Sequence, residues 1–178
     1  MKNLQKAFLF YFSLLIISVI IQGCCTNTYT IIGNGTLRAY SMEEEFTPID
    51  TISGAFILRN EYETRFSGLE DFSLISSAMA TSCAEDFTNK IETESVTITC
   101  NQDFIFDGIT ISAGADFSNL EELKMNFQQF GLNFLELHFQ ESFMSKAIFE
   151  NQEYTFTVTS KTDNSLDLEN QVTILINL

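Results

Sequence analysis

The chain of 178 residues contains no tryptophan, one proline, one histidine, and only nine lysine and arginine residues against 24 aspartate and glutamate residues. The missing tryptophan excludes the cysteine–tryptophan–cysteine core of antibody-type immunoglobulin domains. The formal net charge of −15 repels nucleic acid phosphates and anionic lipid headgroups, which excludes both as ligands. A single histidine leaves any zinc site built around it incomplete.

The sequence also lacks the short motifs that mark common enzymes. It contains no Gly-x-Ser-x-Gly, no His-Glu-x-x-His and no phosphate-binding loop, and it shows no internal repeat. We therefore expect a protein that is not an enzyme and that needs no cofactor.

What is present begins with an apolar leader. Lys2 and Lys6 precede an almost wholly apolar run over 7–21. This pattern is typical of a signal peptide, and the run is shorter than the about 20 apolar residues that a membrane-spanning helix needs. The run ends in Ile21-Gln22-Gly23-Cys24, which resembles the bacterial lipobox. In lipobox signals the cysteine receives a diacylglyceryl group and becomes the first residue after cleavage.

We therefore predict a lipoprotein signal peptide over 1–23, lipid attachment at Cys24 and a short tether over 24–28. Ordinary secretion and an uncleaved anchor are the alternatives. Cleavage would leave seven basic residues against 24 acidic ones, a formal charge of −17. Acyl chains supply stable anchoring, so we expect a domain in the cell envelope, at the outer membrane and outside the cytoplasm. The neighbouring Cys25 has no role that the sequence names.

Residues 29–178 are predicted to form a single domain with a phenylalanine-rich core. Alternating apolar and threonine residues indicate strands near 95–100, 154–159 and 172–177, with a turn at 162–165 between the last two. Apolar runs indicate further strands over 54–60 and 69–79. Gly33-Asn34-Gly35, between short extended runs, predicts a hairpin.

One segment follows helical spacing instead. Leu120, Leu123, Phe127 and Phe130 are spaced by three, four and three residues between Ser118 and Gly131, which predicts a helix of about three turns. A second helical turn is predicted within 142–149. Together these elements predict a mainly β protein, an antiparallel β-sandwich of the immunoglobulin-like kind with one short helix. Strands and helices do not alternate as they do in a parallel sheet.

Cys83 and Cys100 are the thiols left within the domain. In an exported protein such a pair usually forms a disulfide, which here would close an 18-residue loop and stabilise the fold by about 3 kcal/mol. Two separately buried thiols, or a reactive or metal-bound pair, are the alternatives.

Two groups of polar residues invite a metal. His138 shares a strand face with Glu136 and Gln140, but the expected role is a solvent-facing strand residue. A calcium site is the weaker interpretation of the acidic loop that contains Asp103 and Asp107, because asparagine and aspartate there more often serve turns and caps. We therefore predict no metal site.

The order of the motifs resembles that of a group of small, uncharacterised Bacteroidetes-type lipoproteins. A lipobox is followed by the run Ile98 to Phe104, the Ala-Gly segment Ala113 to Leu120 and the strand Phe156 to Thr159. The resemblance implies an envelope location and a domain of unknown function, and it supplies no catalytic residues.

We accordingly expect a lipid-anchored module that binds a protein or a glycan, or that has a structural role. Phe104, Phe106 and Tyr62 are candidates for an exposed aromatic patch. The alternatives are a calcium-dependent glycan binder or a carboxylate-dependent hydrolase that uses Asp103 and Asp107.

Overall fold

The computed structural model describes residues 12–13, 26–42, 47–66, 84–128 and 134–178, and the statements below concern these residues. They fall into two compact units, Met1–Thr30 with Arg65–Thr88, and Ile31–Thr64 with Asn89–Leu178. The strand predicted over 69–79 lies outside the described residues. The single domain predicted over 29–178 stays a prediction.

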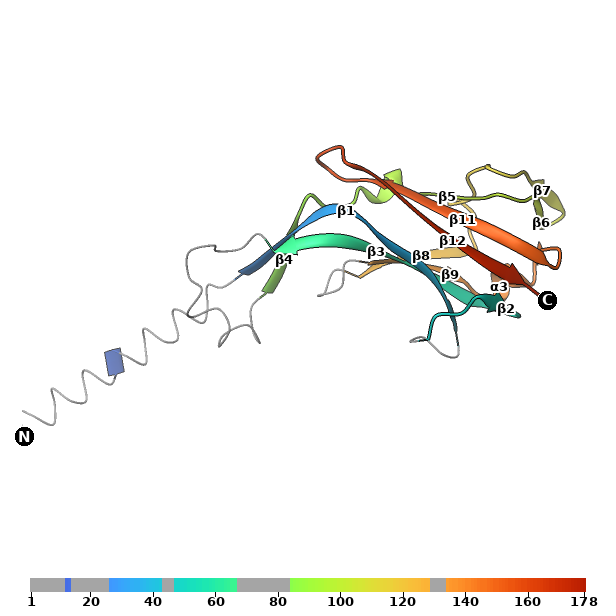
Figure 1. Cartoon of the computed structure of the whole chain (residues 1–178), viewed down its shortest axis with the longest axis horizontal. Coiled ribbons are helices and arrows are strands. Elements are labelled where there is room, and N and C mark those ends of the chain that lie inside the picture. The colour runs from blue at the N-terminus through green and yellow to red at the C-terminus, as the bar shows by residue number, and fades with distance from the viewer. Residues whose placement is uncertain (1–11, 14–25, 43–46, 67–83, 129–133) are drawn as a thin grey trace, which may run out of the picture. The chain divides into compact units, whose positions relative to one another are not determined.

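Two sheets form the layers of the larger unit (Figure 1). In the first, the strands lie in the order β1 (Thr26–Ser41), β3 (Phe56–Phe66), β9 (Phe134–Phe139) and β8 (Leu123–Gln128). In the second, the order is β5 (Thr97–Cys100), β11 (Gln152–Lys161), β12 (Asp167–Ile176) and β2 (Thr51–Ile52).

The shorter elements complete the list. A small third sheet contains β10 (Ala147–Ile148), β6 (Phe104–Phe106) and β7 (Ile109–Ile111), in that order. A 3-10 turn spans Thr93–Ser95, and the short helix α3 spans Glu141–Met144. In the smaller unit, β4 (Ala84–Thr88) pairs in parallel with the first five residues of β1.

The strand order is that of an immunoglobulin-like sandwich. With β1, β3, β5, β8, β9, β11 and β12 taken as strands A to G, one sheet has the order A-B-E-D and the other C-F-G. The pairs β3–β9, β8–β9, β11–β12 and β11–β5 are all antiparallel. The predicted fold class, a mainly β antiparallel sandwich with one short helix, is therefore confirmed.

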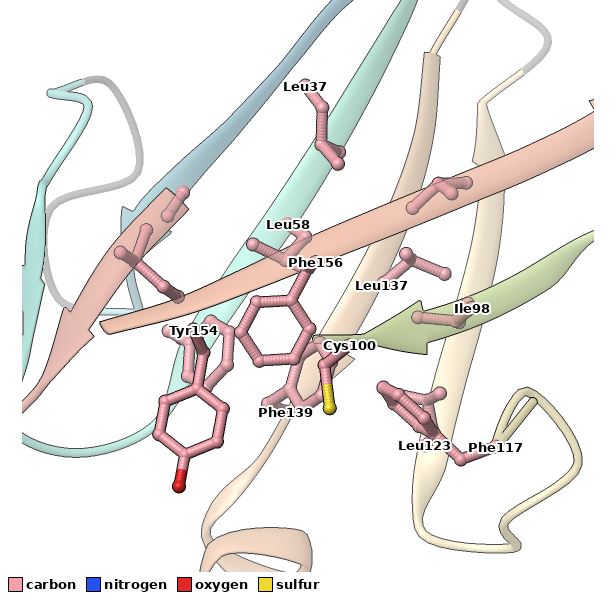
Figure 2. Packing of buried hydrophobic residues seen from close by; sticks show 14 of the residues in the cluster. Leu37, Leu58, Ile98, Cys100, Phe117, Leu123, Leu137, Phe139, Tyr154 and Phe156 are labelled. Carbon is pink, nitrogen blue, oxygen red and sulfur yellow. The ribbon is translucent and has the colours of Figure 1, made fainter. Parts of the chain in front are cut away.

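Aromatic rings fill the space between the sheets. Phe56 of β3 and Phe156 of β11 lie 6.1 Å apart between ring centroids, and Phe139 stacks on Phe56 at 4.3 Å. Figure 2 shows Phe156 and Phe139 in this core with Cys100 beside them. Tyr154 lies two residues before Phe156, and its buried hydroxyl accepts a hydrogen bond of 2.9 Å from the backbone N–H of Glu150.

This arrangement is the tyrosine corner of immunoglobulin-like folds, in which a tyrosine near the start of strand F bonds back to the chain upstream. In antibody domains the residue two positions later is a cysteine that bridges to strand B. Here Phe156 occupies that position and packs against Phe56 of strand B. A pair of rings thus joins the two sheets where antibody domains have a disulfide.

The helix predicted over 118–131 is wrong. Residues 118–122 form turns, and 123–128 form β8, paired with β9 from Leu123 opposite Phe139 to Gln128 opposite Phe134. Leu123, Met125 and Phe127 also alternate with polar residues, and the pairing with β9 selects that period. Instead of capping a helix, Ser118 hydrogen-bonds with its N–H and hydroxyl to Asp116. The second predicted helical turn is present only in its first part, as α3 over Glu141–Met144, and Ala147–Ile148 form β10 instead.

The hairpin predicted at Gly33-Asn34-Gly35 is also wrong, because β1 runs through these residues without turning. Gly35 is needed for close approach instead: a Cβ there would overlap the carbonyl oxygen of Glu61 on β3. Asn34 accepts a 2.8 Å hydrogen bond from the N–H of Glu169 on β12. The predicted carboxyl-terminal hairpin, in contrast, is confirmed by the ten-residue pairing of β11 with β12.

Candidate functional site

Of the four cysteines, only Cys100 lies within the described residues. Cys24, Cys25 and Cys83 lie outside the described residues, so lipid attachment at Cys24 and the Cys83–Cys100 disulfide stay predictions. Cys100 lies on β5 as a free thiol, 2% exposed, and its Sγ donates to the carbonyl oxygen of Gln102 at 2.9 Å. Burial raises the pKa of this thiol, and the charge of Asp103 raises it further. A thiol of this kind is a poor nucleophile.

Within the described residues, no helix is long and apolar enough to cross a membrane. Phe12 and Ser13 are the only described residues of the apolar leader. The signal peptide therefore stays a prediction.

The acidic residues of the 101–118 loop serve the backbone. Asp103 Oδ1 accepts from the N–H of Ala113 at 2.7 Å, and Asn101 Oδ1 accepts from the N–H of Thr155 at 2.7 Å. Asp116 Oδ1 accepts from the N–H of Ile98 and so covers part of the edge of β5. Turn and cap roles, the preferred interpretation of this loop, are thus observed.

Asp107 lies in the two-residue turn between β6 and β7. It has φ of 50°, Gly108 has φ of 77°, and two positive φ values in succession are typical of a type I′ hairpin. Among the residues that the structure describes, no three histidine, cysteine, aspartate or glutamate side chains gather as metal ligands would.

His138 belongs to a polar cluster on the outward face of the β1-β3-β9-β8 sheet. Arg59 of β3 donates through Nε and Nη2 to Oε1 of Glu136 at 2.9 and 2.7 Å. The other carboxylate oxygen, Oε2, lies 3.1 Å from Nε2 of His138. The prediction that His138 and Glu136 share a face is confirmed. The His138 side chain lies on this outward face and is partly covered, with 16% of it exposed.

Two rings enclose the guanidinium of this cluster. The Cζ atom of Arg59 lies 4.8 Å from the ring centroid of Tyr40 and 4.8 Å from that of Phe134, and both rings are buried. The positive charge of Arg59 thus interacts within the protein, with the carboxylate of Glu136 and with the faces of two aromatic rings. The arrangement joins β1, β3 and β9 and is best explained as structural. Sequence reasoning missed Arg59, Tyr40 and Phe134 because their meeting depends on a strand order that no local pattern reveals.

The aromatic patch expected at Phe104, Phe106 and Tyr62 is wrong, since all three residues are buried. Phe104 stacks on Phe149 with ring centroids 4.9 Å apart. Alternation in β6 turns Phe104 and Phe106 inward and leaves Ile105 between them facing outward.

Isoleucines, not aromatic residues, are the exposed apolar residues of this small sheet. Ile105 of β6 is paired directly with Ile148 of β10, and these two are 37% and 63% exposed. Ile109 of β7 is 68% exposed and, by its pairing with Phe106, projects from the other face at the edge of the sheet. We call Ile105 and Ile148, which share one face of this sheet, the isoleucine surface.

Several carboxylates lie close in sequence to the isoleucine surface. Asp107 lies in the turn between β6 and β7, and Glu150 follows Ile148 by two residues. Lys146, just before β10, forms an ion pair with Glu122. This bond to Glu122 raises the pKa of the lysine, and the charges of Glu122, Asp107 and Glu121 raise it further. Three carboxylates thus act on one ammonium group, which leaves the rim negative.

No protein-family model matches the chain, and the comparison with curated proteins finds no match. Among solved structures, the chain is similar to the C-terminal domain of the Streptococcus pyogenes antigen I/II-family protein AspA, with 11% sequence identity and a TM-score of 0.28. The similarity covers 81% of this chain and 46% of that one, so the chain spans less than half of that structure's length. A likeness this distant carries no argument. The strand order and the corner formed by Tyr154 define the class, an immunoglobulin-like β-sandwich.

Proposed function

We propose that this chain is a lipid-anchored, non-enzymatic binding module of the cell envelope. In this proposal Cys24 carries the lipid at the outer membrane, and the isoleucine surface contacts a partner protein. The observation that carries the binding role is the pairing of the exposed Ile105 and Ile148 on one face of a small sheet whose phenylalanines are buried.

The chemistry of this surface favours a protein with an apolar contact flanked by lysine or arginine. Covering the two side chains would contribute on the order of 2–4 kcal/mol before the cost of association. The carboxylates around them attract a cationic rim and repel an acidic one. The same carboxylates disfavour anionic lipid headgroups as the occupant.

The anchor is tested by Cys24→Ser. The variant is expected in the soluble fraction of the envelope, because the lipobox position then has no thiol to receive the diacylglyceryl group. Cys25→Ser keeps that thiol and should stay with the membrane. Fractionation followed by immunoblotting measures both. Membrane retention of Cys24→Ser would contradict the anchor and leave the binding role intact.

The contact surface is tested with the variant Ile105→Thr/Ile148→Thr. Threonine keeps the β-branched shape that suits a strand, so the fold should be preserved. The matched control is Ile32→Thr, because Ile32 is an exposed isoleucine of β1 on another sheet. The wild type, the double variant and the control are each used to capture proteins from the native envelope.

A protein that the wild type and the control capture and the double variant loses supports the proposal. The purified pair should then bind at least about tenfold more weakly when the two isoleucines are replaced, the effect expected for removing two apolar contacts. Capture that is equal for all three forms, or that is lost equally in the control, contradicts it.

A further inference from the structure

The edge of β5 is covered by the loop that follows this strand. Asp116 accepts a hydrogen bond from the N–H of Ile98 at 3.0 Å, and Phe117 donates its own N–H to the carbonyl oxygen of Ile98, also at 3.0 Å. Gly114 donates in the same way to the carbonyl oxygen of Cys100 at 2.8 Å. Because an uncovered edge is a template for pairing with another chain, folded proteins usually protect it.

The edge of β8 differs. β8 lies at the end of its sheet, beside β9. The N–H of Leu123 bonds to the carbonyl oxygen of Leu120 at 3.0 Å instead of to β9. Alternate residues of an antiparallel strand direct their backbone groups to the same side, so Met125 and Phe127 also direct theirs away from β9. No residue that the structure describes bonds to the N–H or the carbonyl oxygen of either one.

The side chains of this edge suit an added strand. Met125 and Phe127 face the core but are only half-buried. Lys124 and Asn126 alternate with them and are exposed on the outward face. A strand added beside β8 would therefore bond to the free backbone groups of both half-buried residues and cover their side chains. Its outward residues would lie beside Lys124 and Asn126.

The charge on this edge determines which kind of strand fits. Lys124 is the only charged residue of β8, and within the described part of the chain it forms no ion pair. Its cross-strand neighbour is His138, whose Nε2 already lies against Glu136. An acidic residue on the added strand, opposite Lys124, would supply an ion-pair partner. A second copy of this chain cannot supply it through its own β8, because that strand contains no acidic residue.

We propose that the edge of β8 is a docking site for an extended segment of a partner protein, which adds to the sheet as a further strand and places an aspartate or glutamate beside Lys124. Main-chain hydrogen bonds to Met125 and Phe127 hold the segment. Lys124 and the two half-buried side chains determine its sequence. This site is separate from the isoleucine surface, which lies on the small third sheet.

The test uses the full chain in detergent and two synthetic peptides with capped ends. The first is Thr-Val-Glu-Val-Thr-Val, and the second has lysine in place of glutamate. NMR titration measures binding, and hydrogen exchange at the amides of Met125 and Phe127 reports where the peptide lies. The glutamate peptide should slow exchange at both amides and bind at least about fivefold more tightly than the lysine peptide. Lys124→Glu, a change at an exposed position, should reverse this preference.

A backbone variant tests the hydrogen bonds separately. Met125→Pro removes an N–H on the open edge without removing a bond to β9, and it should weaken binding of the glutamate peptide by about tenfold or more. Met125→Ala is the matched control, because it shortens the same side chain and keeps the N–H. It should bind within about threefold of the wild type.

Three results would overturn the proposal. The first is a glutamate peptide that leaves both amides unprotected at millimolar concentration. The second is binding that is equal for the two peptides or unchanged by Met125→Pro. The third is protection of the same amides that rises with protein concentration when no peptide is present, since the occupant is then a second copy. None of these results bears on capture through the isoleucine surface.

Discussion

Replacing Tyr154 with phenylalanine tests whether the tyrosine corner stabilises the sandwich. The substitution keeps the buried ring and removes only the hydroxyl that accepts the 2.9 Å hydrogen bond from the N–H of Glu150. A typical hydrogen bond contributes about 1 kcal/mol, and a stranded, partly buried N–H costs about 1 kcal/mol more. We therefore expect Tyr154→Phe to lower the free energy of unfolding by about 1–2 kcal/mol.

Urea denaturation of the full chain carrying Cys24→Ser, which removes the predicted lipid site, measures this loss. The control is Tyr62→Phe, another buried tyrosine, whose hydroxyl contacts Ser160 Oγ at a longer 3.3 Å. It should lose less than half as much. Equal losses in the two variants, or a loss below about 0.5 kcal/mol for Tyr154→Phe, would refute the reasoning that the corner bond is special.

Three further predictions concern other parts of the molecule. Gly35→Ala should lower the free energy of unfolding by more than about 2 kcal/mol, because the new Cβ would overlap the Glu61 carbonyl. Gly54→Ala is the control: a Cβ there meets open space, so urea titrations should show a change of less than about 0.5 kcal/mol. In the reduced protein, the Cys100 thiol should resist iodoacetamide at neutral pH while the fold is intact and become reactive when urea unfolds it, because burial raises its pKa and keeps it protonated; rapid labelling of the folded form would contradict this. Millimolar calcium should leave the unfolding temperature unchanged in calorimetry, and a rise that chelator reverses would favour the calcium-dependent alternative.

Local alternation predicted the fold class well. The strands near 95–100, 154–159 and 172–177 carry a clear two-residue period, and β5, β11 and β12 lie there. Apolar residues at 54–60 likewise became β3. Each of these strands buries one face, so apolar and polar residues alternate along its sequence and predict the strand.

The failures share one cause, which is that long-range pairing decides between two acceptable local patterns. Residues 118–131 satisfy a helical period and a strand period at once, and only the neighbouring β9 selects the strand. Gly33-Asn34-Gly35 suits a turn, yet contact with β3 requires a glycine at position 35 inside a strand. The Arg59 cluster depends on strand order, which the sequence does not state.

The ring pair Phe56–Phe156 has a consequence for when the protein can fold. Because rings join the sheets where antibody domains need a disulfide, this part of the core closes without any oxidation step. The time at which folding can finish depends instead on the order of the strands along the chain. The central strand β11 pairs with β12, which lies near the carboxyl end of the chain. Asn34 of β1, near the amino end, also bonds to β12.

Contacts so distant in sequence form slowly. The sandwich therefore cannot be completed until β12 has been synthesised. Until then, β1 lacks the strand to which Asn34 bonds.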